Sequence, residues 1–416
     1  MQNLALCGAN AIFKTTNLNN VKNQMTTGVG RIDVADVLRG VAILGIILVH
    51  CIEHFDFYSY PDTSGQCALL NFTDKAIWNS LFFLFGGKGY AIFALLFGFS
   101  FFIQDNNQRL KGKDFRPRFI WRMALLFVIG AVNSMFYPGD ILVLYSTLGL
   151  VLVLVCRLPD KAVFWIALIL LLQPFEWWKL INALLDPAYK ASGAWFNASY
   201  GDLTPVQAGG TFGEMVSANL RVGKLAVTNW YVTNGRITQT AGLFVMGLWI
   251  GRKGLLLGED KNLLNWFKVI CWAAVVFFTV EGLRNIFPGL VENRSVMRPL
   301  NLILKSYENM AVTFALVGGI IILFYSTKMQ GLLMKLAPYG RMSLTNYLTQ
   351  SIIGTMLFYN WGFGLHRYLG ITYSFGVGVA LFLLQLWFCQ WWMKSHRHGP
   401  LEYAWKKATW IGAKKE

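Results

Sequence analysis

Long apolar runs separated by short polar segments fill the chain from about residue 35 onward. A helix needs about 20 mostly apolar residues to cross the hydrocarbon of a bilayer. About ten runs approach this length, and each is predicted to be a transmembrane helix. Since lipid offers no partners for backbone groups, an all-α fold is expected. The predicted spans are roughly 35–53, 80–103, 118–136, 140–156, 162–181, 238–251, 265–284, 309–326, 342–359 and 372–393.

Two segments depart from this regular pattern. The second predicted span has three glycines around Lys88, which favours a broken or re-entrant helix. A long segment, 182–237, separates the fifth and sixth spans and contains a helix-like stretch near 212–231. Long connections of this kind are usually functional or disordered, so we expect a periplasmic cap here. The chain shows no clear internal repeat, which gives no support to a transporter built of inverted halves.

The distribution of Lys and Arg predicts the orientation. Cytoplasmic loops carry an excess of both residues. Segment 104–118 is strongly basic, whereas the loop at 137–139 has no charge. An even number of spans with both termini in the cytoplasm fits this bias. Residues 1–30 are polar and lack the apolar core of a signal peptide, so they are expected to form a flexible cytoplasmic tail. The remaining residues, 31–410, are expected to form a single transmembrane helical domain.

Composition supports a multi-pass inner-membrane protein. Of the 416 residues, 55% are hydrophobic and only 14% are charged, against roughly a quarter charged in soluble domains. The net charge of +16 comes from short loops facing an anionic leaflet, so no nucleic-acid partner is expected. The six Cys show no metal-binding spacing, and no metal site is predicted. Whether Cys51 and Cys67 pair is left open.

The first span carries Asp36, Arg39 and His50, whose ionisable side chains are costly in a membrane and therefore mark candidate functional sites. Asp36 and Arg39 lie three residues apart and can pair on one helical face; the alternative is a snorkelling pair that only seats the helix. His50 follows Asp36 by 14 residues, roughly 21 Å along the helix and on the same face. A neutral imidazole can take a proton from an attacking hydroxyl. The alternative for His50 is a hydrogen-bonded structural role.

Further polar residues occur in other spans. Lys88 needs a partner if buried, and Asp140 is one candidate; the glycines around Lys88 also suit an anion pocket. Asp140 opens the fourth span, where it would cap the helix, pair with Lys88 or orient His50. The ninth span has a polar stripe that predicts either interhelical hydrogen bonds or a cavity wall. That stripe comprises Ser343, Asn346, Tyr347, Gln350 and Ser351.

Together these segments resemble the YeiB-like family of bacterial membrane proteins, domain-of-unknown-function family 418. That family is grouped with transmembrane acyltransferases, in which the first span carries an acid-x-x-Arg start followed by a His. His50 falls at the matching place. YeiB-like relatives have Asn there and His at the position of Asn133, so the two residue types are exchanged in this chain. The matching strings are Asp36–Ile46, Lys88 with Phe93–Gly98, Gly139–Tyr145, Gly340–Ser351, Leu357–Tyr359 and Gly399–Glu402.

The resemblance implies transfer of an acyl group from cytosolic acyl-CoA, in the first place acetyl-CoA, to a small-molecule or glycan acceptor at the outer face. The expected alternative is a transporter or flippase for a small polar or anionic solute, and a third option is a non-catalytic scaffold. The bilayer is an expected partner, and a homodimer is plausible. The candidate residues are His50, Asp36 and Asp140 for catalysis; Arg39, Lys88 and Arg341, with the basic loop 104–118, for acyl-CoA; and Asn133, Tyr145, Asn346, Tyr347 and Gln350 for the acceptor.

Overall fold

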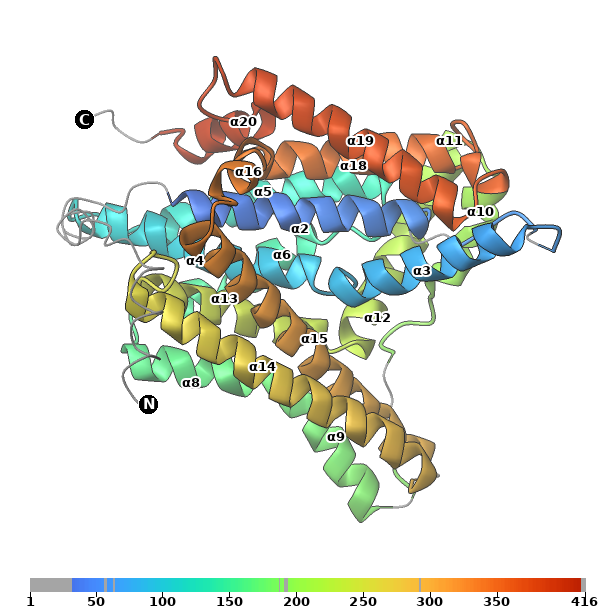
Figure 1. Ribbon diagram of the computed structural model, residues 1–416, viewed down its shortest axis with the longest axis horizontal. Coiled ribbons are helices and arrows are strands. Elements are labelled where there is room, and N and C mark those ends of the chain that lie inside the picture. Colours follow the sequence, from blue (N-terminus) through green and yellow to red (C-terminus); the bar gives the residue numbers. More distant parts are fainter. Residues whose placement is uncertain are drawn as a thin grey trace, which may run out of the picture.

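The chain forms a bundle of long helices, and the computed structural model contains no strand among the residues that it describes (Figure 1). The predicted all-α fold is therefore confirmed. The predicted tail, 1–30, lies outside the described residues. The structure describes residues 32–55, 58–62, 64–186, 188–190, 194–291 and 293–412.

Each predicted span coincides with helix, although several are divided. In the first half of the chain the helices are α2 (Asp33–Ile52), α3 (Ala68–Leu84), α4 (Gly89–Arg109), α5 (Arg116–Phe136), α6 (Leu142–Leu148), α7 (Val151–Val155), α8 (Asp160–Leu171) and α9 (Pro174–Leu185). The second half contains η1 (Tyr200–Leu203), α10 (Thr204–Gly209), α11 (Phe212–Ala218), the π-helical turn η2 (Asn219–Gly223), α12 (Lys224–Thr233), α13 (Arg236–Arg252), α14 (Asp260–Ile286), η3 (Phe287–Gly289), α15 (Arg294–Ser326), α16 (Gln330–Met334), α17 (Ala337–Arg341), α18 (Ser343–Phe358), η4 (Leu365–Arg367), α19 (Ile371–Trp392) and α20 (Pro400–Thr409).

Fewer helices than predicted meet the length and hydropathy expected of a membrane span. Six candidate spans are present in the described residues, or seven if α8 and α9, which meet at a 49° bend, count as one. The predicted spans at 140–156, 238–251 and 342–359 are not among them: a break divides the first into α6 and α7, while α13 and α18 have 17 and 16 residues. The chain is thus a multi-pass membrane protein by its helices, with α3 and α4 joined across a break at Lys88.

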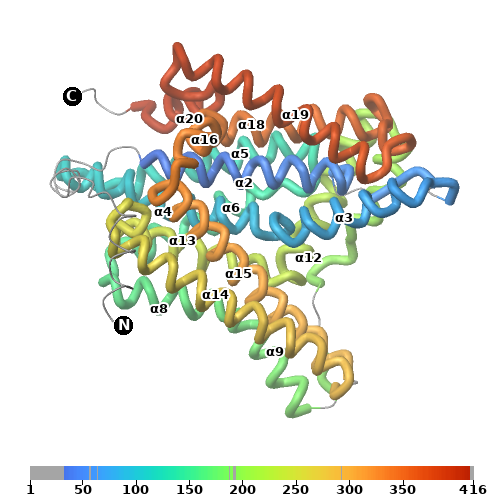
Figure 2. Tube along the Cα trace, viewed as in Figure 1, coloured from blue at the N-terminus to red at the C-terminus, as the bar shows by residue number. Residues whose placement is uncertain are grey.

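The bundle has two parts that share α4. The parallel set of α2, α5, α18 and α19 runs along the long axis, while α14 and α15 lie side by side and cross it diagonally (Figure 2). The start of α2 and the helix α20 lie at the same end of the bundle (Figure 1). The opposite end carries the C-terminal end of α2 and the short helices α10 and α11.

The crossing of α4 and α13 depends on glycine. A Cβ on Gly98 would collide with the carbonyl oxygen of Phe244, and one on Gly247 would collide with that of Leu95. Small residues let helix backbones approach this closely in membranes. This contact fixes α13 against α4 and so positions Arg236, at the start of α13, beside the break between α3 and α4.

Replacing Gly98 by Val is expected to destabilise the protein, because the new side chain meets backbone rather than a movable side chain. Overpacking of this kind costs about 1–3 kcal/mol. The measurement is the thermal unfolding midpoint of the detergent-solubilised protein. Gly319→Val, a substitution into open space on α15, is the matched control. Equal midpoints for both variants would contradict the importance of this crossing.

The predicted cap region, 182–237, is largely helical in the described residues, and α11, η2 and α12 cover 212–233 continuously. Hydrogen bonds attach this region to the end of the bundle that carries the C-terminal end of α2. The Asn219 amide donates to the carbonyl oxygens of Met135 and Phe136 at 3.1 Å each, and the Gln207 amide donates to the Tyr359 hydroxyl at 3.0 Å. The segment therefore packs against the ends of α5 and α18.

Candidate functional site

A cavity of about 820 Å³ lies between the C-terminal end of α2, the α3–α4 break, α12, α13 and α15. The walls combine aromatic rings with an unusual number of ionisable groups for a membrane domain. These groups are His50, Glu53, Lys88, Arg236, Arg284, Arg298, Lys305 and Glu308.

His50 reaches the cavity from the last turn of α2. Its ring lies 5.2 Å from the Tyr137 ring and 5.3 Å from the Phe55 ring, centroid to centroid. The imidazole Nε2 lies 3.5 Å from the Tyr137 hydroxyl, which is long for a hydrogen bond. The other nitrogen, Nδ1, is buried and has no partner among the described residues. Within the described part of the chain, Nε2 therefore has no strong hydrogen bond, as a proton acceptor at a cavity wall requires.

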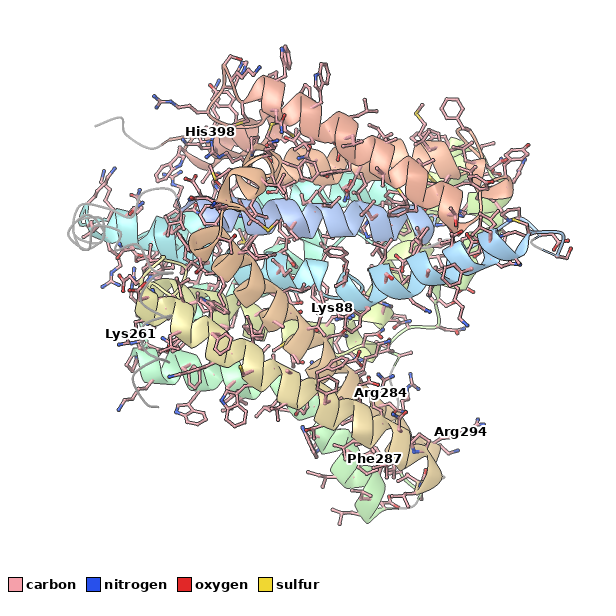
Figure 3. The ribbon with its side chains drawn as sticks, in the orientation of Figure 1. Lys88, Lys261, Arg284, Phe287, Arg294 and His398 are labelled. Atoms are coloured by element: carbon pink, nitrogen blue, oxygen red, sulfur yellow. The ribbon has the colours of Figure 1, made fainter. Side chains whose placement is uncertain are left out.

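The break between α3 and α4 places Lys88 inside the molecule, and Figure 3 labels it at this kink. Gly87 has φ of +74°, a left-handed conformation that favours glycine and turns the chain there. The Lys88 side chain is only 3% exposed. Its ammonium donates to the carbonyl oxygen of Phe82 at 3.2 Å. In the described residues no ion pair joins Lys88 to Asp140.

Arg236 faces the cavity from α13 and was not among the residues predicted from the sequence. Its guanidinium donates to the Tyr90 hydroxyl at 2.6 Å and to the Gln239 side-chain oxygen at 2.8 Å. It also lies over the rings of Tyr90 and Trp230, at 4.6 and 5.1 Å from their centroids. Its position two residues before the predicted sixth span was the available signal in the sequence.

A polar stripe on α15 forms another wall and was also missed. Helix α15 begins at Arg294, about four turns before the predicted span at 309. Residues three and four positions apart share a helical face, and this spacing brings a row of polar side chains to the cavity. Arg284 of α14, labelled in Figure 3, pairs with Glu308 at 2.6 Å. The stripe comprises Arg298, Asn301, Lys305, Glu308 and Asn309.

Asp140 lies behind the cavity wall in a buried hydrogen-bond network. The Asn133 amide donates to its carboxylate at 2.7 Å, and the backbone N–H of Val143 donates at 3.2 Å. The Tyr231 hydroxyl donates to the Asp140 carbonyl oxygen at 2.6 Å. The Tyr347 hydroxyl, which lines the cavity, accepts the backbone N–H of Ile141 at 3.2 Å. This network joins α5, α6, α12 and α18 and does not bring Asp140 to His50.

The remaining acceptor candidates do not line the cavity, and two of them, Tyr145 and Asn346, make interhelical hydrogen bonds. The Tyr145 hydroxyl donates to the Tyr90 carbonyl oxygen at 2.6 Å, and the Asn346 amide donates to the Tyr339 carbonyl oxygen at 2.9 Å. Both polar atoms of the Gln350 side chain are buried without a partner among the described residues.

Asp36, Arg39 and Arg341 form a separate ion-pair network at the start of α2. Arg39 pairs with Asp36 at 2.6 Å and donates to the Ser100 hydroxyl at 2.7 Å. Arg341 reaches Asp36 at 3.3 Å and Asp33 at 3.1 Å. Asp36 and His50 lie near opposite ends of α2, roughly 21 Å apart. The structure therefore does not bring these two predicted catalytic residues together.

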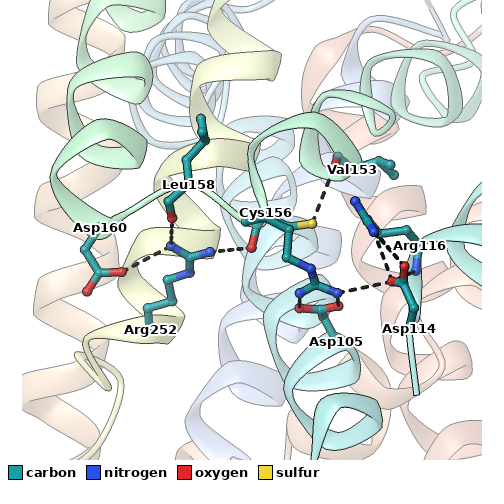
Figure 4. A network of polar contacts seen from close by, with 9 residues as sticks. Asp105, Asp114, Arg116, Val153, Cys156, Leu158, Asp160 and Arg252 are labelled. Carbon is teal, nitrogen blue, oxygen red and sulfur yellow. Dashed lines mark hydrogen bonds and ion pairs between the residues drawn. The ribbon is translucent and has the colours of Figure 1, made fainter. Parts of the chain in front are cut away.

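Several charged residues of the basic loop 104–118 form ion pairs within the protein (Figure 4). Arg157 pairs with Asp105 at 2.8 Å and with Asp114 at 3.1 Å. Hydrogen bonds from Arg116 hold the pKa of the Asp114 carboxyl well below its ordinary value. Arg252 likewise binds Asp160 and the carbonyl oxygens of Cys156 and Leu158. Arg109, Lys111 and Lys113 remain exposed at this end.

The question of a disulfide is settled by the structure, in which Cys51 is a buried free thiol and Cys67 an exposed one. Among the described residues, no group of three or more His, Cys, Asp or Glu side chains is arranged to hold a metal ion.

Comparisons with known proteins find relatives of this chain, and none of them carries an assigned function. Residues 250–412 match the sequence profile of a family described as "Protein of unknown function (DUF418)". The chain is 26% identical to the uncharacterized protein YxaH of Bacillus subtilis, across 92% of this chain and 94% of the relative. It is 27% identical to the uncharacterized protein YeiB of Escherichia coli, across 90% of this chain and 95% of the relative. No solved structure matches the chain. These similarities support a YeiB-like, DUF418 assignment.

Proposed function

We propose that this protein is a membrane-embedded acyltransferase that moves an acyl group from acyl-CoA to an acceptor bound in the cavity. The observation that carries this proposal is the position of His50. Its imidazole lies at the wall of a cavity large enough for a small substrate, and its Nε2 makes one long contact, 3.5 Å to the Tyr137 hydroxyl, among the described residues. In the orientation predicted from the basic loops, this end of α2 faces outward.

His50 acts as the general base in this proposal. A hydroxyl of the acceptor loses its proton to the imidazole as its oxygen attacks the thioester carbonyl carbon. The carbon–sulfur bond then breaks, and the imidazolium returns the proton to the departing thiolate of CoA. Tyr137 and Tyr347 line the same cavity, and their hydroxyls are candidates to stabilise the oxyanion of the tetrahedral intermediate.

Of the groups expected on sequence grounds to bind the donor, we keep the basic loop 104–118. Arg39 and Arg341 are held by carboxylates, so the exposed cations of loop 104–118 are better placed to meet the phosphates of acyl-CoA. Lys88 lines the cavity and is assigned to the acceptor. The thioester end of acyl-CoA, on its extended pantetheine arm, must then reach along α2 from the basic end to His50, where the carbon–sulfur bond breaks.

Acyl transfer predicts that the purified protein in nanodiscs releases free CoA thiol from acetyl-CoA only when an envelope extract supplies the acceptor. The labelled acetyl group should appear in an extract component. The two measurements are thiol release and label incorporation, with empty nanodiscs as the control. Absence of both at millimolar acetyl-CoA would contradict acyl transfer.

Transport of an anionic solute is the second candidate, because discontinuous helices line the substrate sites of many transporters. Here the α3–α4 break lines the cavity at Lys88, and α8 and α9 meet at a 49° bend. This alternative predicts uptake of solute into proteoliposomes with no release of CoA thiol. The same protein preparation therefore separates the two functions.

A further inference from the structure

We infer that the cavity binds a phosphate group through Lys88, Arg236, Arg298 and Lys305, so that the acceptor of the proposed transfer is a phosphate-bearing molecule. This inference deepens the proposed function by naming the chemistry of its acceptor. These four residues form the phosphate subsite. They come from the α3–α4 break, α13 and α15, and all four line the cavity.

The first argument is the balance of charge. Five Lys and Arg side chains line the cavity against two carboxylates, those of Glu53 and Glu308. Glu308 is bound by Arg284 at 2.6 Å, and Glu53 accepts the Tyr58 hydroxyl at 2.6 Å. In the part of the chain that the structure describes, no salt bridge joins any residue of the phosphate subsite to a carboxylate. The cavity therefore has an excess of positive charge and attracts anions.

The second argument is the burial of donor atoms on two of these cations. The Lys88 side chain is 3% exposed, and its ammonium has one neutral hydrogen-bond acceptor, the Phe82 carbonyl oxygen. The Nε of Arg236 is buried without an acceptor in the described residues. Burial of a charged donor is costly unless an acceptor or counter-charge satisfies it. A bound anion would supply both to these donors.

The third argument is the path from the surface to Lys88. Arg298 and Lys305 are exposed and lie two helical turns apart on the same face of α15, whereas Lys88 is buried. Exposed cations at the mouth of a cavity raise the local concentration of an anion and guide it inward. The neutral side chains of Asn301 and Ser306 lie along the same wall and can donate hydrogen bonds.

The number of cations favours phosphate over a single carboxylate. A phosphate monoester carries about −1.5 to −2 charge at neutral pH and three strong acceptor oxygens. It can therefore accept from several cations at once. His50 lines the same cavity, so an acceptor anchored by its phosphate can present a hydroxyl to the imidazole. The phosphate group can belong to a soluble compound or to a lipid headgroup.

Calorimetric titration of the purified full-length protein, without any acyl donor, tests this inference. The soluble probes are inorganic phosphate and glycerol 3-phosphate, and the lipid probe is phosphatidic acid in the nanodisc. We expect saturable binding that weakens roughly tenfold in Arg236→Gln, as the loss of one charged hydrogen-bond donor predicts, and that weakens further with added salt.

Two further variants make the result specific. Lys305→Gln changes an exposed side chain, so this variant should fold even if Arg236→Gln does not. It should also bind the phosphate probes more weakly than the wild type. Arg294→Gln is the matched control, because Arg294 is a cation of α15 at the tip of the α14–α15 hairpin, outside the cavity lining (Figure 3). Its affinity should equal that of the wild type.

The outcomes show whether the phosphate belongs to a soluble compound or to a lipid, and whether the inference holds. Binding of the soluble probes supports a soluble acceptor, whereas binding of phosphatidic acid alone supports a lipid acceptor. Binding of neither probe, or equal binding by the wild type, Arg236→Gln and Lys305→Gln, overturns the inference. Acyl transfer to a neutral acceptor would also overturn it while leaving the proposed transferase activity intact. Phosphate binding without release of CoA thiol would support the phosphate subsite and contradict the proposed acyl transfer.

Discussion

Acyl transfer by the His50→Gln variant is expected to fall by about 10³-fold, because removal of a general base typically costs 10²–10⁴-fold in rate. Glutamine keeps a polar side chain of similar length in the last turn of α2 but cannot take a proton from the acceptor. The neighbouring Tyr137 and Phe55 rings keep a filled wall beside it. The measurement is the initial rate of acetyl incorporation at saturating acetyl-CoA.

The control for His50→Gln is His396→Gln, which changes an exposed histidine in the turn after α19. It should leave the rate unchanged. The thermal unfolding midpoints of both variants should match the wild type, which separates lost chemistry from lost folding. A His50→Gln rate within threefold of the wild type would exclude His50 as the base. The reaction would then need another group in the cavity.

The sequence predicted much of the helical framework, because apolar runs of near-membrane length report directly on burial in lipid. The start of α2 was predicted within a few residues, and the glycines around Lys88 correctly indicated a broken helix. The spacing of Asp36 and Arg39 also predicted their ion pair. These features depend on local pattern, which is why they could be found without the tertiary structure.

The cationic wall of the cavity could not be predicted in this way. Hydropathy placed the eighth span at 309–326, because Arg298 and Lys305 lower the average over the preceding turns. Helix α15 nevertheless begins at Arg294, since these charged residues face the cavity while apolar neighbours such as Val296 and Ile303 pack inward. A hydropathy average cannot distinguish a polar stripe on a helix from a loop.

The shared face of Asp36 and His50 along α2 was a sound geometric expectation, but the two residues meet different surroundings. Arg341, which binds Asp36, lies 305 positions away in the chain. Its contribution depends on the close approach of α17 to α2, where a Cβ on Gly340 would collide with the Asp36 carbonyl oxygen. Only the tertiary structure separates a group at the cavity wall from one in an ion-pair network.

Replacement of Asp36 by Ala is therefore expected to act on stability. The Asp36 carboxylate is 2% exposed and holds two guanidiniums, those of Arg39 and Arg341, which are 21% and 25% exposed. Removing one partner of a buried ion pair costs about 3–5 kcal/mol; because both arginines reach solvent in part, we expect roughly 2–4 kcal/mol. The measurement is the shift of the thermal unfolding midpoint in a fixed detergent, together with the yield of folded protein.

Asp33→Ala is the matched control. Asp33 is 45% exposed, and of the two arginines that bind Asp36 it pairs with Arg341. A salt bridge of this kind contributes about 0–1 kcal/mol, so the midpoint should move little. Asp36→Asn should be intermediate, since an amide can still accept one hydrogen bond from an arginine. In each variant, the protein that remains folded should keep its rate of acyl transfer per molecule. An Asp36→Ala protein that unfolds like the wild type but has lost transfer would instead assign Asp36 a direct part in the chemistry, and the ion-pair network would then belong to the donor site.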